Sequence, residues 1–299
     1  MKNFFNKNKY FILVFIVIIG MIIYSFIDYD KFVKNYTNAI ENTISECKIN
    51  TIPERQEYCD NILKENINPK PGFYYNYFEI YSRLNLLEYG LFFIVTIPII
   101  YFITKTFKNR HIIYELTRET YKKFKTNLFK KAYLYSLILP LIILIILVAT
   151  IIYSGGLTLN PYYDQEMNDI VVKAINPYFY VTTIVLRALI LGIIYANIAL
   201  IVSRKNHNFY IAVILSYLAS VGTEIILEGV IGRLIFYEIF KIDSMMIYIN
   251  IVNILSLNLE KGYLCIYLPL ILILVVSTFI AKLVYKNKEK LIIDCDKNN

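Results

Sequence analysis

The sequence contains few of the residues from which catalytic and metal sites are built. Among 299 residues there are two histidines, four cysteines and no tryptophan, and only 18% of the residues are charged. His111 and His207 lie outside any HExxH or carboxylate–histidine pattern, and no Gly-x-Ser-x-Gly or Gly-Lys-Ser/Thr motif is present. These absences argue against a zinc protease, a serine hydrolase and a P-loop ATPase. We therefore expect this chain to have no catalytic site, no cofactor and no metal.

The sequence is rich instead in long apolar runs. Hydrophobic residues make up 57% of the chain, and the mean hydropathy is +0.51. About 20 helical residues cross the hydrocarbon core of a bilayer, where helices satisfy their own backbone hydrogen bonds. We expect an all-α, polytopic membrane protein with a single transmembrane domain over residues 1–299. Its six spans are predicted at Tyr10–Phe26, Leu86–Phe107, Ala132–Tyr153, Tyr178–Val202, Phe209–Leu227 and Tyr263–Tyr285.

The distribution of charge predicts the orientation of these spans. The net charge is +8, and lysine and arginine are concentrated in every second connecting segment, beginning with the N-terminal one. Because short basic loops stay in the cytoplasm, we expect both termini to be cytoplasmic and the chain to be a multi-pass protein of the cell membrane. The positive charge is therefore a topology signal. Membrane lipid is an expected partner, and nucleic acid is not.

The largest soluble segment is the predicted outer loop, residues 27–85. Apolar residues continue at helical spacing beyond the first span, which predicts an amphipathic helix that extends outward. Cys47 and Cys59 share this loop and could form a disulfide in an oxidising compartment, and the alternative is two free thiols. The loop is too small to promise an independent domain, and it fits a cap over an external opening or a docking surface.

Residues 105–131 form the main predicted cytoplasmic loop. Apolar side chains alternate there with lysine and arginine. This pattern predicts one or two short amphipathic helices that lie along the inner membrane surface. A basic loop attracted to anionic lipid would give the same pattern.

Two of the charged residues within the predicted spans, Arg187 and Glu224, could form an ion pair. Arg187 is in the fourth span, where a charge is costly unless it pairs, reaches the interface or faces a cavity. Glu224, near the outer end of the fifth span, is its nearest candidate partner by depth. Arg187 could instead reach the outer interface or contact a substrate.

Residues 229–262 are rich in Ile, Leu, Phe, Tyr and Met although they are predicted to lie outside. Lys241 and Asp243 divide them into two apolar runs, each shorter than a comfortable span. A re-entrant helical hairpin before the last span explains both features. Two further crossings, which would give eight spans, are the alternative.

This layout resembles the membrane subunits of type-2 ABC exporters, the permease partners of bacterial efflux ATPases. Those subunits have six spans with both termini inside, a coupling helix between spans two and three, and a re-entrant hairpin before the last span. An enlarged first outer loop occurs in several of them. Glu115-Leu116 and Lys130-Lys131 can be laid on the family's local pattern of an acidic residue, Leu, a turn and Lys. The family's Gly before the Glu is missing, and Tyr121 stands where its Pro falls.

By this resemblance, segment 105–131 would dock onto a cytoplasmic ABC ATPase through Glu115, Leu116, Arg118 and Glu119. Two permease chains, identical or different, and two ATPases would form the translocator, with ATP hydrolysis on the partner. The cargo would be amphiphilic: an antimicrobial peptide, a drug or a lipid-linked molecule. The alternative is a non-transporting membrane immunity or scaffold protein that acts through its outer loop.

Overall fold

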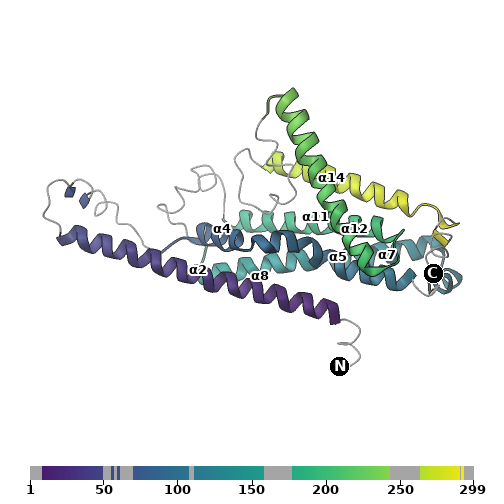
Figure 1. The fold of residues 1–299 in the computed structure, drawn as a ribbon, viewed down its shortest axis with the longest axis horizontal. Coiled ribbons are helices and arrows are strands. Elements are labelled where there is room, and N and C mark those ends of the chain that lie inside the picture. The colour runs from purple at the N-terminus through teal and green to yellow at the C-terminus, as the bar shows by residue number, and fades with distance from the viewer. Residues whose placement is uncertain are drawn as a thin grey trace. The chain divides into compact units, whose positions relative to one another are not determined.

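A computed structural model describes residues 9–49, 55–56, 59–60, 70–107, 111–157, 177–242, 263–289 and 291–292 (Figure 1). These residues form helices joined by turns and contain no strand, so the all-α class is confirmed for the described part of the chain. Within that part, five helices are long and apolar enough to cross a membrane, at Gly90–Phe107, Tyr121–Tyr153, Val181–Ser203, Phe209–Ile239 and Tyr267–Val284. The first predicted span lies in a further helix, so six spans and the side on which each terminus lies stay predictions.

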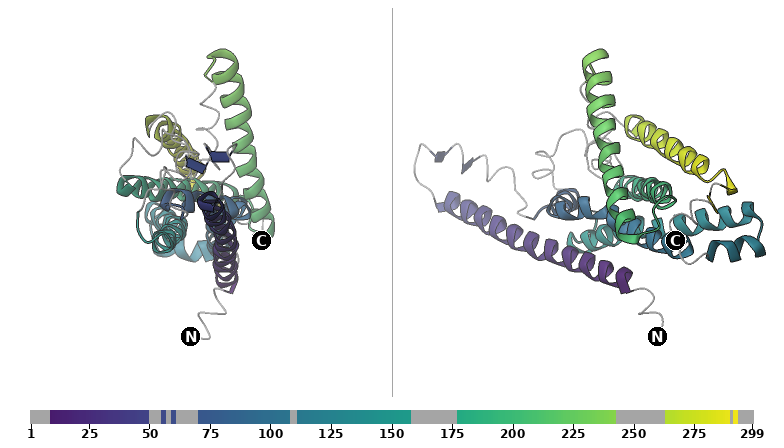
Figure 2. Two further views of the ribbon diagram at one scale, coloured as in Figure 1. Left: turned by 90° about the vertical axis from the view of Figure 1, so that its left-hand side faces the viewer. Right: turned by 45° about the vertical axis from the view of Figure 1, so that its right-hand side comes forward.

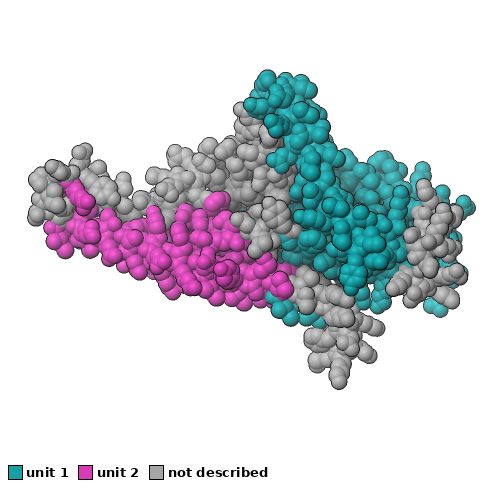
Figure 3. All heavy atoms as spheres, in the orientation of Figure 1, with its two compact units in different colours: residues 1–16, 87–144, 180–299 teal, residues 17–86, 145–179 magenta. Residues whose placement is uncertain are grey.

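The chain divides into two compact units (Figure 3). Unit 1 comprises residues 1–16, 87–144 and 180–299, and unit 2 comprises residues 17–86 and 145–179.

Most of helix α2 (Lys9–Ile49) belongs to unit 2, and it contains the first predicted span. It continues past Phe26 without a break, as the apolar spacing predicted, and at about 1.5 Å per residue its 41 residues extend roughly 60 Å. Helix α4 (Phe73–Arg83) follows in the same unit. Its residues Phe73, Tyr77 and Ile80 recur every three or four positions and are buried, so α4 packs through one apolar face.

Helices α5 (Asn85–Phe107) and α11 (Pro177–Ser203) supply much of the core of unit 1. The rings of Phe92 in α5 and Tyr195 in α11 meet edge to face, with centroids 5.2 Å apart. Gly192 of α11 lies against helix α7 (Tyr121–Ser136). A Cβ atom at Gly192 would lie 2.7 Å from the carbonyl oxygen of Ser136, so only glycine permits this close approach of the two backbones.

The predicted cytoplasmic loop folds as two helices, α6 (His111–Arg118) and α7. Thr120 caps α7 by accepting a hydrogen bond from the Lys123 amide at 3.4 Å. At its other end α7 continues through Leu137 into α8 (Ile138–Tyr153), and the Leu141 amide donates to the Leu137 carbonyl at 3.2 Å. The sequence predicts one or two short helices in this segment, and two are present; their position along the membrane surface stays a prediction. Helix α7 is continuous with the third apolar run, and together they form one 33-residue helical stretch.

Helix α12 (Phe209–Ile225) also extends further than expected. It leads directly into the π-helical segment η2 (Ile226–Ile239), and Figure 2 shows them as one long green rod. Gly229, where the outer hairpin was predicted to begin, lies inside this rod. Residues 243–262, the second half of that hairpin, are outside the described residues, so the hairpin and the eight-span alternative stay predictions. The last predicted span is helix α14 (Tyr263–Val284).

Candidate functional site

The α6–α7 hairpin and the end of α5 enclose a cavity of about 190 Å³ in unit 1. Three of the four residues assigned to ATPase coupling line it, namely Glu115, Arg118 and Glu119, whereas Leu116 does not. The remaining lining residues are Phe102 and Thr106 from α5, and Phe124, Asn127, Leu128 and Lys131 from α7. An open cavity with both acidic and basic walls is suited to receive a polar or charged group from a partner.

Glu119 anchors the turn between the two helices. One of its carboxylate oxygens lies 3.3 Å from the Lys123 ammonium, and the other accepts a hydrogen bond from the Asn127 side chain at 3.1 Å. The Glu119 amide donates to the Glu115 carbonyl at 2.9 Å, which continues the helical hydrogen bonding past the end of α6. These contacts fix the hairpin locally, and they assign Glu119 a structural role that the sequence did not indicate.

The buried Tyr285 connects α7 to two other helices of unit 1, α14 and α11. The Tyr121 hydroxyl donates to the Tyr285 carbonyl at 2.7 Å, just beyond the end of α14. The Tyr285 hydroxyl in turn donates to the Leu200 carbonyl of α11 at 3.0 Å. The Arg204 guanidinium lies 5.7 Å from the centre of the Tyr285 ring, within cation–π range. Sequence reasoning missed Tyr285 as a contact residue, because its partners are far away in the chain.

A second polar junction lies among the apolar faces of the same helices. Asn197 of α11 is fully buried and accepts a hydrogen bond from the Tyr133 hydroxyl of α7 at 3.0 Å. Its amide nitrogen donates to Ser277 at 3.1 Å and to Thr278 at 3.0 Å, both in α14. A buried amide in apolar surroundings stabilises only when it is fully paired, as it is here. The asparagine within an apolar run was the signal that could have indicated this junction.

The structure does not bring Arg187 and Glu224 together as an ion pair. Arg187 lies in α11 with 1% of its surface exposed, whereas Glu224 lies in α12 and is partly buried. Among the described residues, the ion pairs formed do not include this one. Burial of Arg187 inside unit 1 argues against the alternative in which its side chain reaches the outer interface. One turn away, the Thr183 carbonyl accepts a hydrogen bond from the Tyr267 hydroxyl at 3.1 Å.

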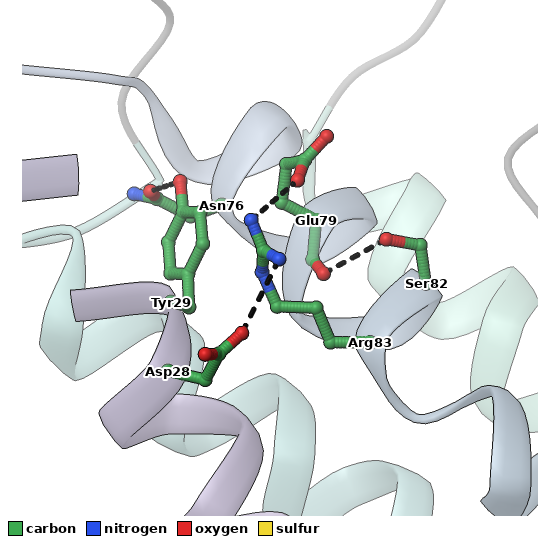
Figure 4. Close-up of polar contacts among 6 residues, drawn as sticks. All are labelled: Asp28, Tyr29, Asn76, Glu79, Ser82 and Arg83. Atoms are coloured by element: carbon green, nitrogen blue, oxygen red, sulfur yellow. Dashed lines mark hydrogen bonds and ion pairs between the residues drawn. The ribbon is translucent and has the colours of Figure 1, made fainter. Parts of the chain in front are cut away.

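Unit 2 contains a different polar cluster, which Figure 4 shows. The Tyr29 hydroxyl donates to the Asn76 carbonyl oxygen at 2.5 Å, and the Asn76 amide nitrogen donates to Ser154 at 2.7 Å and to the Pro71 carbonyl at 3.2 Å. All the hydrogen-bonding groups of this buried side chain are therefore satisfied within the protein. Burial raises the pKa of the Tyr29 phenol well above its usual range.

An arginine lies beside this cluster. The Arg83 guanidinium forms ion pairs with Asp28 at 3.4 Å and Glu79 at 3.2 Å, and its carbon lies 4.9 Å from the centre of the Phe32 ring. The cluster therefore ties α4 to the part of α2 beyond the first apolar run. Its charged groups are already engaged with one another.

Cys47, near the end of α2, and Cys59 are joined by a disulfide in the structure. Among the described residues, no group of three or more His, Cys, Asp or Glu side chains is arranged to hold a metal ion.

No family model, curated protein or solved structure matches this chain. The structure defines an all-helical protein whose long apolar helices are consistent with a membrane protein.

Proposed function

We propose that this chain is the permease subunit of an ATP-driven ABC exporter in a bacterial cell membrane. Two such chains and a separate cytoplasmic ATPase would move an amphiphilic substrate, such as an antimicrobial peptide, a drug or a lipid-linked molecule, out of the cell. One observation carries the proposal: the α6–α7 hairpin forms an open, charged cavity at the end of a helix that continues as a candidate span.

In this proposal, the continuous helix formed by α7 and α8 transmits force from the hairpin. A helix is stiff along its axis because each turn is hydrogen-bonded to the next. Force applied by a partner at the hairpin would therefore pass along α7 into α8. The contact between the Tyr121 hydroxyl and the Tyr285 carbonyl would also pass it to α14 and, through the Tyr285 hydroxyl, to α11. A docking movement at one place would thus reach three further helices.

Export by this chain would need a source of energy outside it. The predicted spans contain almost no Asp or Glu, the residues on which proton-coupled carriers depend. The sequence also contains no P-loop motif for ATP. Uphill transport by this chain therefore requires a partner that hydrolyses ATP.

The outer part of α2 supports a second candidate function, a non-transporting immunity or scaffold protein. Most of the side chains from Lys31 to Ile49 are exposed, and the disulfide of Cys47 with Cys59 lies near the end of the helix. A long exposed helix of this kind offers a surface to an external partner. This reading requires no ATPase.

Co-purification from the native host tests the two candidates against each other. The full chain is purified in a mild detergent and again in lipid nanodiscs, and the eluate is identified by mass spectrometry. The export proposal predicts a P-loop ATPase at about equal stoichiometry. Recovery of the chain without an ATPase in both media would overturn it and favour the scaffold function.

Variants at the hairpin then test the docking site. Glu115→Lys combined with Leu116→Asp reverses one charge on the cavity wall and introduces another beside it. We expect this variant to reach the membrane normally but to lose most of the co-eluting ATPase and of the ATP hydrolysis measured in the complex. Glu41→Lys, an exposed charge reversal on α2, is the matched control and should change neither.

Tyr121→Phe is a gentler second variant, because it removes a single hydroxyl and leaves the cavity walls in place. The ATPase should still co-elute with it, whereas hydrolysis in the complex should depend less on the permease. Normal ATPase recovery and activity with the double variant would show that docking occurs elsewhere.

A further inference from the structure

Helix α7 carries a strong positive charge that the protein itself does not neutralise. It contains five lysines and no acidic residue. Only Lys123 forms an ion pair among the described residues, with Glu119. The apolar side chains of α7, including Phe124, Leu128 and Phe129, are buried against the rest of unit 1. Lys122, Lys130 and Lys131 are exposed.

Two lysine ammonium groups, one from α7 and one from α5 itself, lie over aromatic rings at neighbouring positions of α5. The Lys131 ammonium lies 5.0 Å from the centre of the Phe102 ring, and the Lys105 ammonium lies 5.9 Å from the centre of the Tyr101 ring. Because Tyr101 and Phe102 are consecutive residues of one helix, both ammonium groups lie at a similar level along it. Contact with a ring restricts each lysine while leaving its charge exposed.

An exposed apolar stripe begins directly after these lysines. Leu134, Leu137, Leu141 and Leu144 follow Lys130 at spacings of three or four residues, so they share one face of the α7–α8 helix with it. All four are exposed, Leu134 by 65% and Leu141 by 57%. From Lys130 to Leu144 the helix rises roughly 20 Å, somewhat more than half of a hydrocarbon core about 30 Å thick. One helix face thus presents a cation followed by an apolar surface about as long as one leaflet of the hydrocarbon core is thick.

We propose that Lys105, Lys130 and Lys131 bind the headgroup of an anionic phospholipid, whose acyl chain lies along Leu134–Leu144. A phospholipid such as phosphatidylglycerol offers an anion joined to hydrocarbon, in the same order and over the same length. A nucleic acid or an acidic peptide would match the lysines but leave the leucine stripe uncovered. The site needs no ATPase, so this inference and the export proposal succeed or fail independently.

The absence of tryptophan provides a clean reporter for the site. Tyr135→Trp places a single tryptophan beside Phe102, since the Tyr135 and Phe102 rings have centroids 6.1 Å apart. The full-length variant is reconstituted in phosphatidylcholine vesicles that contain increasing fractions of brominated phosphatidylglycerol or of brominated phosphatidylcholine. Because bromine quenches tryptophan only at short range, quenching reports the lipid next to the site.

We expect brominated phosphatidylglycerol to compete for the site at least about fivefold better than phosphatidylcholine, the factor one lysine near a membrane surface typically contributes. Lys105→Gln, Lys130→Gln and Lys131→Gln together should reduce this preference to about one. Lys31→Gln, Lys34→Gln and Lys48→Gln on α2 remove the same charge elsewhere and should leave it unchanged. If the triple variant at the site is not recovered, Lys130→Gln alone should lower the preference measurably.

Two results would overturn the proposal. The first is equal quenching by the two brominated lipids in the otherwise unchanged protein. The second is a phosphatidylglycerol preference that survives removal of the three lysines. A preference that weakens when salt is raised from about 50 to 500 mM would support the electrostatic basis, and one insensitive to salt would contradict it.

Discussion

Arg83 of unit 2 and Lys131 of unit 1 make nearly the same contact with an aromatic ring but differ in everything around it. The charge of Arg83 lies 4.9 Å from the centre of the Phe32 ring, and that of Lys131 lies 5.0 Å from the centre of the Phe102 ring. Arg83 also has two carboxylate partners, Asp28 and Glu79, whereas Lys131 forms no ion pair among the described residues. The first cation is used to hold helices together. The second retains its capacity to bind something else.

A similar difference extends to the other polar groups nearby. Beside Arg83, each polar atom of the Asn76 side chain has a partner in the protein. Beside Lys131, the hairpin leaves an open cavity lined by Glu115, Arg118 and Glu119. Buried polar groups are most stabilising when satisfied internally, whereas a binding site needs a cavity that a partner can enter. We therefore expect substitutions in the first cluster to affect stability and those in the second to affect binding.

The largest effect is expected at Asn76. Asn76→Ala removes three hydrogen bonds and leaves the buried Tyr29 hydroxyl without its acceptor, which should lower the free energy of unfolding by about 3 kcal/mol. Titration with sodium dodecyl sulfate in mixed micelles measures this change. Asn42→Ala, at an exposed position of α2, is the control and should lie within about 0.5 kcal/mol of the parent. A loss at Asn76 no greater than at Asn42 would show that water reaches the cluster.

A smaller effect distinguishes the two cations directly. Arg83→Gln leaves Asp28 and Glu79 without their shared partner and should cost about 1 kcal/mol, because these groups are partly exposed. Lys131→Gln should cost about 0.5 kcal/mol, since only the exposed contact with Phe102 is lost. Both variants are measured by the same titration. Equal losses would contradict the distinction between a structural cation and an available one.

The helices were largely predictable because hydrophobic length and spacing act locally. The apolar runs predicted the positions of long helices, and the spacing of Phe32, Tyr36 and Ile40 predicted the outward extension of α2. The lysine-rich segment of α7 was harder. Its charge indicates a separate helix, but α7 is continuous with the third apolar run and its Phe124 and Leu128 are buried against the protein.

The polar contacts could not be predicted, because they join residues far apart in sequence. Tyr121 and Tyr285 are separated by 164 positions, and Tyr29 and Asn76 by 47. Matching Arg187 with Glu224 by depth alone is limited for a related reason. Depth in a membrane gives the level of a residue but not the face of the helix on which it lies. Three of the four proposed coupling residues line one cavity in the structure. Their position in the loop did not indicate that Glu119 is held in place by a hydrogen bond.

A last effect is expected at alkaline pH, and it tests whether water is excluded from the Asn76 cluster. Burial raises the pKa of Tyr29 in the folded protein, so folding favours its protonated form. The corresponding stability is fully present below the unfolded pKa of about 10 and is lost as the pH rises above it toward the folded value. The free energy of unfolding should therefore fall above pH 10 by up to about 1.4 kcal/mol per pH unit more steeply in the parent than in Tyr29→Phe. Tyr36→Phe, which alters an exposed ring, should keep the slope of the parent. Equal slopes in all three proteins would mean that Tyr29 ionises as readily when folded as when unfolded, and the closed cluster of unit 2 would then be as open to solvent as the hairpin of unit 1.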